Sequence, residues 1–278
     1  MKKYKSDRAF DIVNGLIIAI LCVTFILPFW MMIISSFTEE ISLRVNGYKL
    51  FPSAFSAAGY EYIFSSSDYN ILRAIINSVI ISVSGTVLSV AVSLITAYAL
   101  SKKYVVGIKG INVFYIITMF FAGGTIPLYL VIRGIGLYDT IWALIIPSMF
   151  SLYHIILVRS YFYSLPAALE EAAMIDGATC LERIWHVNLP SILPTVTIML
   201  VLQMGGLMSV GHEKALLMQN ALNLEASELV STYVYKIGLK KAQYSLSTAV
   251  DMLNSIVNVV LMLSMNWVVK KIGQVSAL

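Results

Sequence analysis

Six long apolar segments dominate this sequence and limit what the chain can fold into. They run approximately through residues 12–37, 71–100, 111–132, 141–158, 192–210 and 246–269. A helix needs roughly 20 mainly apolar residues to cross a bilayer, and it satisfies its own backbone hydrogen bonds in lipid. We therefore expect an all-α, polytopic membrane protein with about six transmembrane helices and no separate soluble catalytic domain.

The same segments predict a single transmembrane domain over residues 12–270. An N-terminal segment, 1–11, precedes it and a C-terminal tail, 271–278, follows it. The basic start and first apolar run could form a signal peptide, but the run extends to Phe37 and has no small-x-small cleavage site. A retained first helix is the expectation.

Composition and charge exclude several classes of protein. Hydrophobic residues make up 59% of the chain and charged residues 12%, whereas an ordinary soluble domain has about half and a quarter. The formal charge is +4, but the 19 basic residues stand singly or in small clusters beside the apolar segments. That distribution indicates topology signals and no nucleic-acid partner. Cys22 and Cys180 have neither disulfide nor metal-site spacing and are interpreted as structural.

Basic residues in the short connections predict the orientation. With an even number of spans, three basic groups fall on one side of the membrane, and the positive-inside rule makes that side the cytoplasm. The groups are Lys2, Lys3, Lys5, Arg8, Lys102, Lys103, Lys109, Lys270 and Lys271. Both termini are then cytoplasmic, and so is the connection that carries Arg159 and Arg183. The longer connections, 38–70 and 211–245, lie outside, and the lysines of the second are a partial exception.

One interior stretch, residues 164–190, is less membrane-like than its surroundings and reads as a short surface helix followed by a turn. Pro166 suits a helix start, and residues 167–175 are mostly good helix formers. Glu170 and Glu171 favour the positive end of the helix dipole, and Gly177 is a natural stop. From the spacing alone, an amphipathic helix lying on the membrane is an equal alternative.

The motifs in this stretch resemble a known family. Glu171-Ala172-Ala173, Asp176-Gly177-Ala178 and Leu189-Pro190 resemble the cytoplasmic signature of permease subunits of binding-protein-dependent ABC importers. Further similarity lies in Asn77-Ser78, Gly85-Thr86, Ala97-Tyr98-Ala99-Leu100-Ser101-Lys102, Gly123-Gly124-Thr125-Ile126-Pro127, Ser231-Thr232-Tyr233-Val234-Tyr235 and Gln243-Tyr244-Ser245. The chain looks most like the maltose-type second permease of the carbohydrate branch, in the subgroup associated with oligosaccharides and polysaccharide breakdown products. It departs from the pattern at Ile184 and His212, where an aromatic residue is frequent.

The resemblance implies an ABC type I importer permease fold and a coupling element that docks into a separate ATPase. The residues it assigns to coupling are Glu171, Ala172, Ala173, Met174, Ile175, Asp176, Gly177 and Ala178. It further implies a second homologous permease, an ABC ATPase dimer, an extracellular solute-binding (lipo)protein and a carbohydrate substrate, in the bacterial cytoplasmic membrane. ATP and magnesium would bind the partner ATPase, so no cofactor or metal is expected on this chain.

Polar side chains within the apolar segments are candidates for the translocation path between the two permeases. They are Asn77, Gln203, Asn254 and Asn258. Intramembrane polar groups usually face protein or a cavity, so hydrogen bonding between helices is an alternative for each. His154 and Asp251 could suggest a proton relay, but both stand near span ends, which favours a solvated or packed role.

Two other classes of function fit less well. His212-Glu213 could begin a zinc-protease motif, but Leu216 stands where the second histidine is needed. The sequence also lacks a Gly-x-Ser-x-Gly elbow and a Walker phosphate loop, so we expect no enzyme activity on this chain. A secondary transporter or channel would need inverted repeats or a selectivity filter, and it would leave the coupling signature unexplained.

Overall fold

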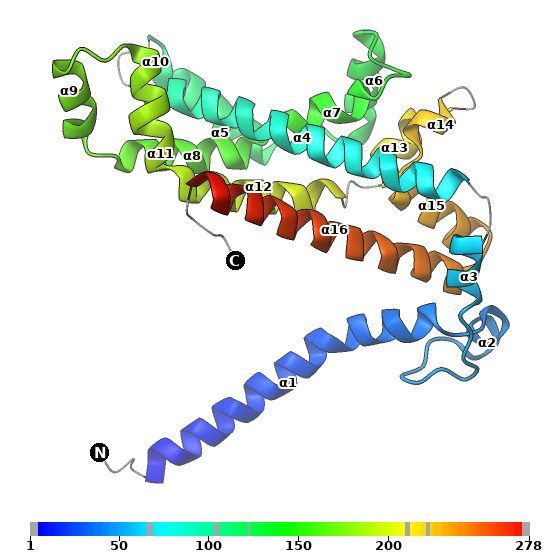
Figure 1. Cartoon of the computed structure of the whole chain (residues 1–278). Coiled ribbons are helices and arrows are strands. Elements are labelled where there is room, and N and C mark those ends of the chain that lie inside the picture. The colour runs from blue at the N-terminus through cyan, green and yellow to red at the C-terminus, as the bar shows by residue number, and fades with distance from the viewer. Residues whose placement is uncertain are drawn as a thin grey trace. The chain divides into compact units, whose positions relative to one another are not determined.

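The computed structural model describes residues 5–65, 69–102, 106–121, 123–208, 212–220 and 223–273. Within these ranges the chain is almost entirely helical, apart from one isolated β-bridge between Thr38 and Phe55 (Figure 1). The helices up to residue 134 are α1 Lys5–Ser36, α2 Glu40–Asn46, α3 Ala58–Ser65, α4 Tyr69–Ser101, α5 Ile108–Phe120 and α6 Thr125–Gly134. Those up to residue 191 are α7 Trp142–Met149, α8 Leu152–Ser164, α9 Ala167–Ile175, α10 Cys180–Arg183, the π-helix η1 Ile184–Asn188 and α11 Leu189–Ser191. The remainder are α12 Leu193–Met208, α13 His212–Met218, α14 Leu224–Ser227, α15 Val230–Tyr235, the π-helix η2 Lys236–Lys240 and α16 Tyr244–Gly273.

Among the described residues, four helical stretches are long and apolar enough to cross a membrane. They are Phe10–Ser36, Asn70–Ser101, Trp142–Ser164 and Tyr244–Val268. A bent pair, Cys180–Ser191 with Leu193–Gly206, gives a fifth if it is counted as one span. The prediction of an all-α chain with several membrane-spanning helices is confirmed. Residues 1–4 and 274–278 of the predicted terminal segments, and with them Lys2 and Lys3, lie outside the described residues, as does Lys103.

The third apolar segment, residues 111–132, was predicted as one helix, and this is wrong. The structure divides it into α5 and α6, of 13 and 10 residues. The break has a local cause, because Phe121 is extended and Gly124 has a φ of +87°. Only glycine adopts that conformation freely, so the helix ends before the Gly-Gly pair and restarts at Thr125.

The chain divides into two compact units. The first combines the residues up to Asp68 with Tyr233–Leu253, and the second combines Tyr69–Thr232 with the residues from Asn254 onward. In the first unit, α1 exposes every side chain from Phe10 to Trp30, as suits a helix covered by lipid or protein. The other end of the unit is ordered by polar contacts: both carboxylate oxygens of Glu40 accept backbone N–H groups at the start of α16.

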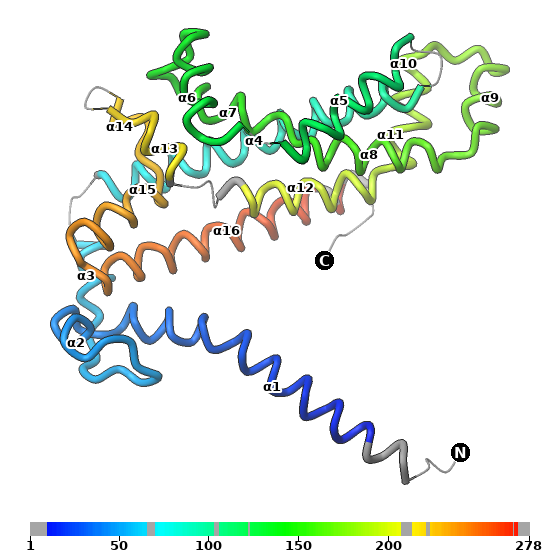
Figure 2. Tube along the Cα trace, turned by 180° about the vertical axis from the view of Figure 1, so that it is seen from behind, coloured from blue at the N-terminus to red at the C-terminus, as the bar shows by residue number. Residues whose placement is uncertain are grey.

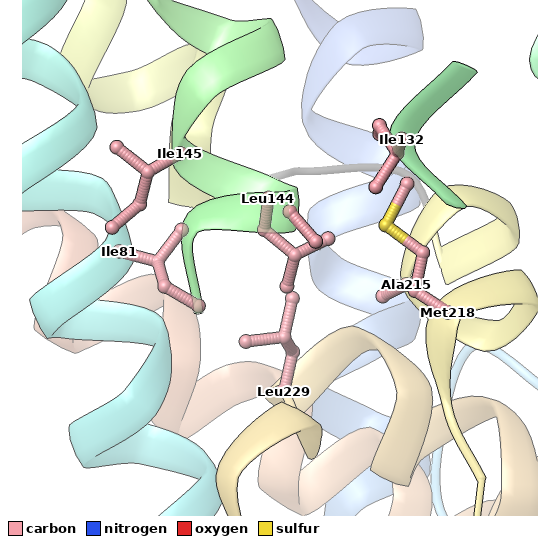
Figure 3. Close-up of a cluster of buried hydrophobic side chains, with 8 residues drawn as sticks. Ile81, Ile132, Leu144, Ile145, Ala215, Met218 and Leu229 are labelled. Atoms are coloured by element: carbon pink, nitrogen blue, oxygen red, sulfur yellow. The ribbon is translucent and has the colours of Figure 1, made fainter. Parts of the chain in front are cut away.

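The second unit is built around α4, which packs against α7, α8 and α12. Small residues allow α4 to approach its neighbouring helices closely. Ser82, Gly85, Ser89 and Ser93 are all buried. An apolar cluster joins α4, α6, α7 and the residues around α13 and α14, as Figure 3 shows. A second cluster joins α4, α8 and α12. Within this unit, α9 and α10 lie near one end of α4 and α13 and α14 near the other (Figure 2).

Candidate functional site

The segment 164–190 folds into the short helix that the sequence predicts. Pro166 is extended, with φ −59° and ψ 127°, and the helix α9 follows over Ala167–Ile175. A proline before the first turn is favourable because it fixes φ where no intrahelical N–H partner is needed. Glu170 lies in the first turn, where a carboxylate stabilises the positive end of the helix.

A Schellman turn ends α9. Ala178 donates its backbone N–H to the Ala173 carbonyl at 2.9 Å, and Gly177 donates to Met174 at 3.1 Å. These are the two bonds that close this type of helix end, and they require the left-handed conformation. Gly177 supplies it with a φ of +80°. Asp176, the C-cap, is exposed beside it.

A second helix starts directly after this turn. Thr179 and Glu182 form a capping box at α10: the Thr179 N–H donates to Glu182 Oε2 at 2.7 Å and the Glu182 N–H donates to the Thr179 hydroxyl oxygen at 3.4 Å. The hydrogen bonds from the Thr179 backbone and hydroxyl lower the pKa of the exposed Glu182 carboxyl. Two capped helices therefore meet at Gly177, so the turn has a defined shape although it lies on the surface.

The chain leaves the segment through an irregular helix. A π-helix, η1, covers Ile184–Asn188, and its closing bond runs from the Leu189 N–H to the Ile184 carbonyl. Pro190 and Pro194 lack the N–H that a regular helix would use at their positions. The axis bends by 72° between Cys180–Ser191 and Leu193–Gly206. The Leu189-Pro190 motif thus coincides with the change of direction into α12.

The coupling residues predicted from the sequence form one exposed surface. Glu171, Ala172, Met174, Ile175, Asp176 and Gly177 are exposed, and Ala173 and Ala178 are half-buried. Ile175 is 86% exposed. Sequence reasoning missed two more large apolar side chains on the next helical stretch, Leu181 at 78% and Trp185 at 68% exposed. Their i, i+4 spacing after the Thr179 cap was a signal for a shared face.

Sequence reasoning also missed the contacts of Glu170. Its Oε1 accepts a hydrogen bond from Asn188 Nδ2 at 2.9 Å and a charge-assisted one from Lys102 Nζ. Burial pushes the pKa of Glu170 upward, but these hydrogen bonds and the charges of Lys102 and Arg183 outweigh it. The pKa therefore lies below the ordinary glutamate value, and the carboxyl is ionised at neutral pH.

The candidate translocation-path residues differ in how their amides are used. Asn77 Nδ2 donates to the carbonyls of Glu225 and Glu228, each at 3.1 Å, and so ties α4 to α14. Gln203 Nε2 lies 3.5 Å from the Ser148 carbonyl. Asn254 and Asn258 stand one turn apart on α16, and their Oδ1 atoms are buried and accept no hydrogen bond within the described chain. Unused acceptor capacity is therefore found at Asn254 and Asn258.

The connection 211–245, expected as a loop, contains the short helices α13, α14, α15 and η2. Asp139 holds part of it, because its carboxylate accepts from Asn223 Nδ2 at 2.7 Å and from Asn220 Nδ2. Asn220 and Asn223 also exchange backbone-to-side-chain bonds at 2.9 and 3.0 Å. These bonds hold the side chains of Asn220 and Asn223 against Asp139 and against each other.

The two ionisable residues of the spans lie in different surroundings. His154 is buried on α8, whereas Asp251 is half-buried and lines a pocket of about 310 Å³ between α1 and the start of α16. No group of three or more His, Cys, Asp or Glu side chains that could hold a metal ion occurs in the described ranges.

Two proteins of Bacillus subtilis are similar to this chain in sequence. Protein LplC of Bacillus subtilis is 36% identical over 196 residues, which cover 70% of this chain and 66% of LplC. The polygalacturonan/rhamnogalacturonan transport system permease protein YtcP of the same organism is 35% identical over 68% of this chain and 66% of its own length. The alignments thus span slightly less than two thirds of each relative.

Solved structures match almost the whole chain. A chain of a bacterial ABC transporter involved in the import of the acidic polysaccharide alginate superposes with a TM-score of 0.78, at 25% identity, over 98% of this chain and 99% of its own. A chain from an alginate ABC transporter in complex with an alginate pentasaccharide-bound periplasmic protein gives a TM-score of 0.74 at 20% identity, over 98% of both chains.

The segment with the Schellman turn and the Leu189-Pro190 bend lies inside the region that a family model matches. That model describes the inner membrane component of binding-protein-dependent transport systems, and it matches residues 89–274. Most of the chain is thereby covered, including α8 to α12. The protein belongs to the family of inner membrane components of binding-protein-dependent transport systems.

Proposed function

We propose that this chain is a permease subunit of an ATP-driven ABC importer that moves an oligosaccharide across the cytoplasmic membrane. Its partners are a second homologous permease, an ABC ATPase dimer and an extracellular solute-binding protein. Both termini lie in the cytoplasm, with ATP and magnesium bound on the ATPase. One observation carries the proposal: in a chain of this family, residues 167–183 form an exposed helix, turn and second helix. The first helix ends in a Schellman turn and the second begins with a capping box.

The exposed surface of this helix–turn has the chemistry of a docking site. Met174 and Ile175 expose apolar surface to water, and burying that surface against a partner would be favourable. Exposed apolar patches of this kind mark interaction sites. Ala172 and Ala173 add contact without bulk, so a partner can approach the helix closely. Glu171 is exposed beside them, and in this proposal its carboxylate pairs with a basic residue on the ATPase. These contacts transmit force and do no chemistry.

The proposed cycle has two states. ATP binding closes the ATPase dimer and draws the paired coupling helices together, which turns the permease pair from inward-facing to outward-facing. Hydrolysis resets the pair. Because ATP binds on another chain, this chain changes conformation only in response to its contacts with the ATPase. The ordered turn at Gly177 suits such a contact.

The names of the relatives support a carbohydrate substrate. YtcP is described for polygalacturonan and rhamnogalacturonan, and the structural relatives for alginate; all of these are uronate-containing polysaccharides. We therefore place the substrate among oligosaccharides released from such polymers. Asn254 and Asn258 are the stronger candidates for its path, because their amide oxygens accept no hydrogen bond within the described chain. The amide nitrogen of Asn77, in contrast, is already engaged by two backbone carbonyls.

The first test is purification of the tagged chain in mild detergent, with mass spectrometry of the chains that accompany it. We expect a second permease, an ATPase and a binding protein. In Ile175→Glu the ATPase should be lost while the second permease stays. Ile135→Glu is the matched control, since Ile135 is also exposed, at 61%, but lies outside the coupling segment. A wild-type chain recovered alone would contradict the importer proposal and favour a secondary transporter.

The second test asks what is carried. The recovered complex, reconstituted in liposomes with its binding protein, is offered labelled trigalacturonate, alginate trisaccharide and maltotriose. We expect ATP-dependent uptake of a uronate oligosaccharide. Uptake of maltotriose alone would keep the importer and correct the substrate class; no ATP dependence for any of the three would contradict the proposed function.

A further inference from the structure

The helix α9 has no buried side chain to hold it in place. Of its nine residues, only Glu170 and Ala173 are half-buried, and they stand one turn apart on the same face. Ala173 offers a single methyl group to that face. An apolar contact of this size cannot set the direction of a helix, so the orientation of α9 must come mainly from polar contacts.

Glu170 makes those contacts. Its Oε1 accepts hydrogen bonds from Lys102 Nζ and from Asn188 Nδ2, and thereby joins three elements: the end of α4, the first turn of α9 and the end of η1. The Asn188 residue is 2% exposed, and the side chains of Lys102 and Glu170 are 16% and 30% exposed. Partial removal from water strengthens such charge-assisted bonds.

The end of α4 is itself firmly held. The Leu100 carbonyl accepts hydrogen bonds from Arg159 Nε at 3.2 Å and from the Tyr163 hydroxyl at 3.5 Å, both on α8. The positive charge of Arg159 also suits the negative, C-terminal end of the α4 dipole. The Lys102 ammonium lies 4.6 Å from the centroid of the Tyr98 ring, within the range of a cation–π contact. Lys102, directly after the last residue of α4, is thus held in place at the end of that helix.

We infer that Glu170 is a positioning residue: its carboxylate, held between Lys102 and Asn188, sets the direction of α9 and links the coupling helix to α4. This inference rests on the proposed function. A displacement of the exposed face of α9 reaches the end of α4 through the contact between Glu170 and Lys102. α4 has 33 residues and forms the centre of the second unit, so its displacement would move α7, α8 and α12 with it. Glu171, the neighbouring residue, faces outward toward the ATPase in this scheme.

Charge reversal tests the link in the whole complex. Four forms are compared: wild type, Lys102→Glu, Glu170→Lys and the reversed pair with both changes. Two quantities are measured, the ATPase recovered per permease and the uptake per ATP hydrolysed, using the oligosaccharide that the wild type takes up among the three named above. We expect each single change to lower at least one quantity by about tenfold, a typical size for coupling between sites. The reversed pair should recover part of the loss, because it restores the ion pair but not the hydrogen bond that Asn188 Nδ2 donates to Glu170.

A control pair lies near the other end of α4. Arg73 Nη1 and Glu225 Oε2 form an exposed ion pair at 2.9 Å, and its reversal, Arg73→Glu with Glu225→Arg, should leave both quantities unchanged. Recovery in the reversed pair at 102 and 170 separates positioning from a general loss of folding. The double change restores the attraction between opposite charges but restores no packing contact. Single changes without effect, or a reversed pair as defective as the singles, would overturn the inference while the wild type still imports. A wild type without ATP-dependent import would instead remove the proposed function and this inference with it.

Discussion

Ala178 donates its backbone N–H to the Ala173 carbonyl at 2.9 Å, and this bond closes only because Gly177 between them has a φ of +80°. An added Cβ at Gly177 would meet nothing within 4 Å. The requirement for glycine is therefore conformational and not steric: a non-glycine residue in this conformation costs about 1–2 kcal/mol.

Substitutions at Gly177 should therefore rank by their tolerance of the left-handed conformation. Gly177→Asn should keep most uptake because Asn adopts this conformation readily, Gly177→Ala should lose more, and Gly177→Val should lose most. Gly177→Trp adds bulk on the docking side and should abolish uptake while membrane insertion and ATP hydrolysis persist. Uptake per ATP hydrolysed is the measurement. Equal losses for Asn and Val would point to space and contradict the conformational argument.

Leu181 and Trp185 should belong to the same docking surface as Ile175. Large aromatic side chains carry a disproportionate share of interface energy, often about 2 kcal/mol or more. We expect Trp185→Ser to reduce the ATPase recovered with the chain by about tenfold or more, and Leu181→Ser by less. Val106→Ser is the control, because Val106 is 95% exposed but lies outside segment 164–190. A normal ATPase yield from Trp185→Ser would assign these side chains to the lipid headgroups instead.

What the sequence predicts well is local. The bounds of α9 follow from Pro166 before it and Gly177 after it, because both residues act through their own φ angle and need no tertiary partner. The same logic applied to the Gly123-Gly124 pair would have divided the third apolar segment. The overall apolarity of that segment concealed the break, since hydropathy measures transfer to lipid and carries no information about φ.

What the sequence predicts poorly depends on contacts between distant residues. Glu170 and Lys102 are separated by 68 positions, and nothing in either neighbourhood marks them as partners. Likewise, the connection 211–245 reads as a polar loop, but Asp139, 84 positions before Asn223, orders part of it. Charged and amide side chains have many possible partners, so only the folded chain selects among them.

Acid should release the coupling helix. The pKa of Glu170 lies below its ordinary value because of hydrogen bonds and positive charge from Lys102, Asn188 and Arg183 that outweigh burial. A carboxyl with a depressed folded-state pKa stabilises the fold above its unfolded-state pKa, about 4.3, and this contribution is lost as the pH falls through the folded-state value. Hydrogen exchange of the α9 amides, corrected for intrinsic rates, should therefore accelerate in that acidic window and stay constant between pH 6 and 8. Glu170→Gln should exchange fast at every pH; a wild-type response that Glu170→Gln retains would assign the titration to another group.

Glu40 should stabilise the first unit through the start of α16. Its Oε1 and Oε2 accept the backbone N–H groups of Tyr244 and Ser245, each at 2.8 Å, and these are among the N–H groups that a helix leaves unpaired at its first turn. Removing the carboxylate in Glu40→Ala should cost about 1–3 kcal/mol, and Glu40→Gln, which keeps one acceptor oxygen, should cost less. Thermal unfolding of the detergent-solubilised chain measures the difference.

Arg44→Ala is the control, because the Arg44–Glu40 pair is a partly exposed i, i+4 contact worth only about 0.3–0.5 kcal/mol. If Arg44→Ala lowers the unfolding temperature as much as Glu40→Ala, the ion pair and not the helix start accounts for the stability that Glu40 provides.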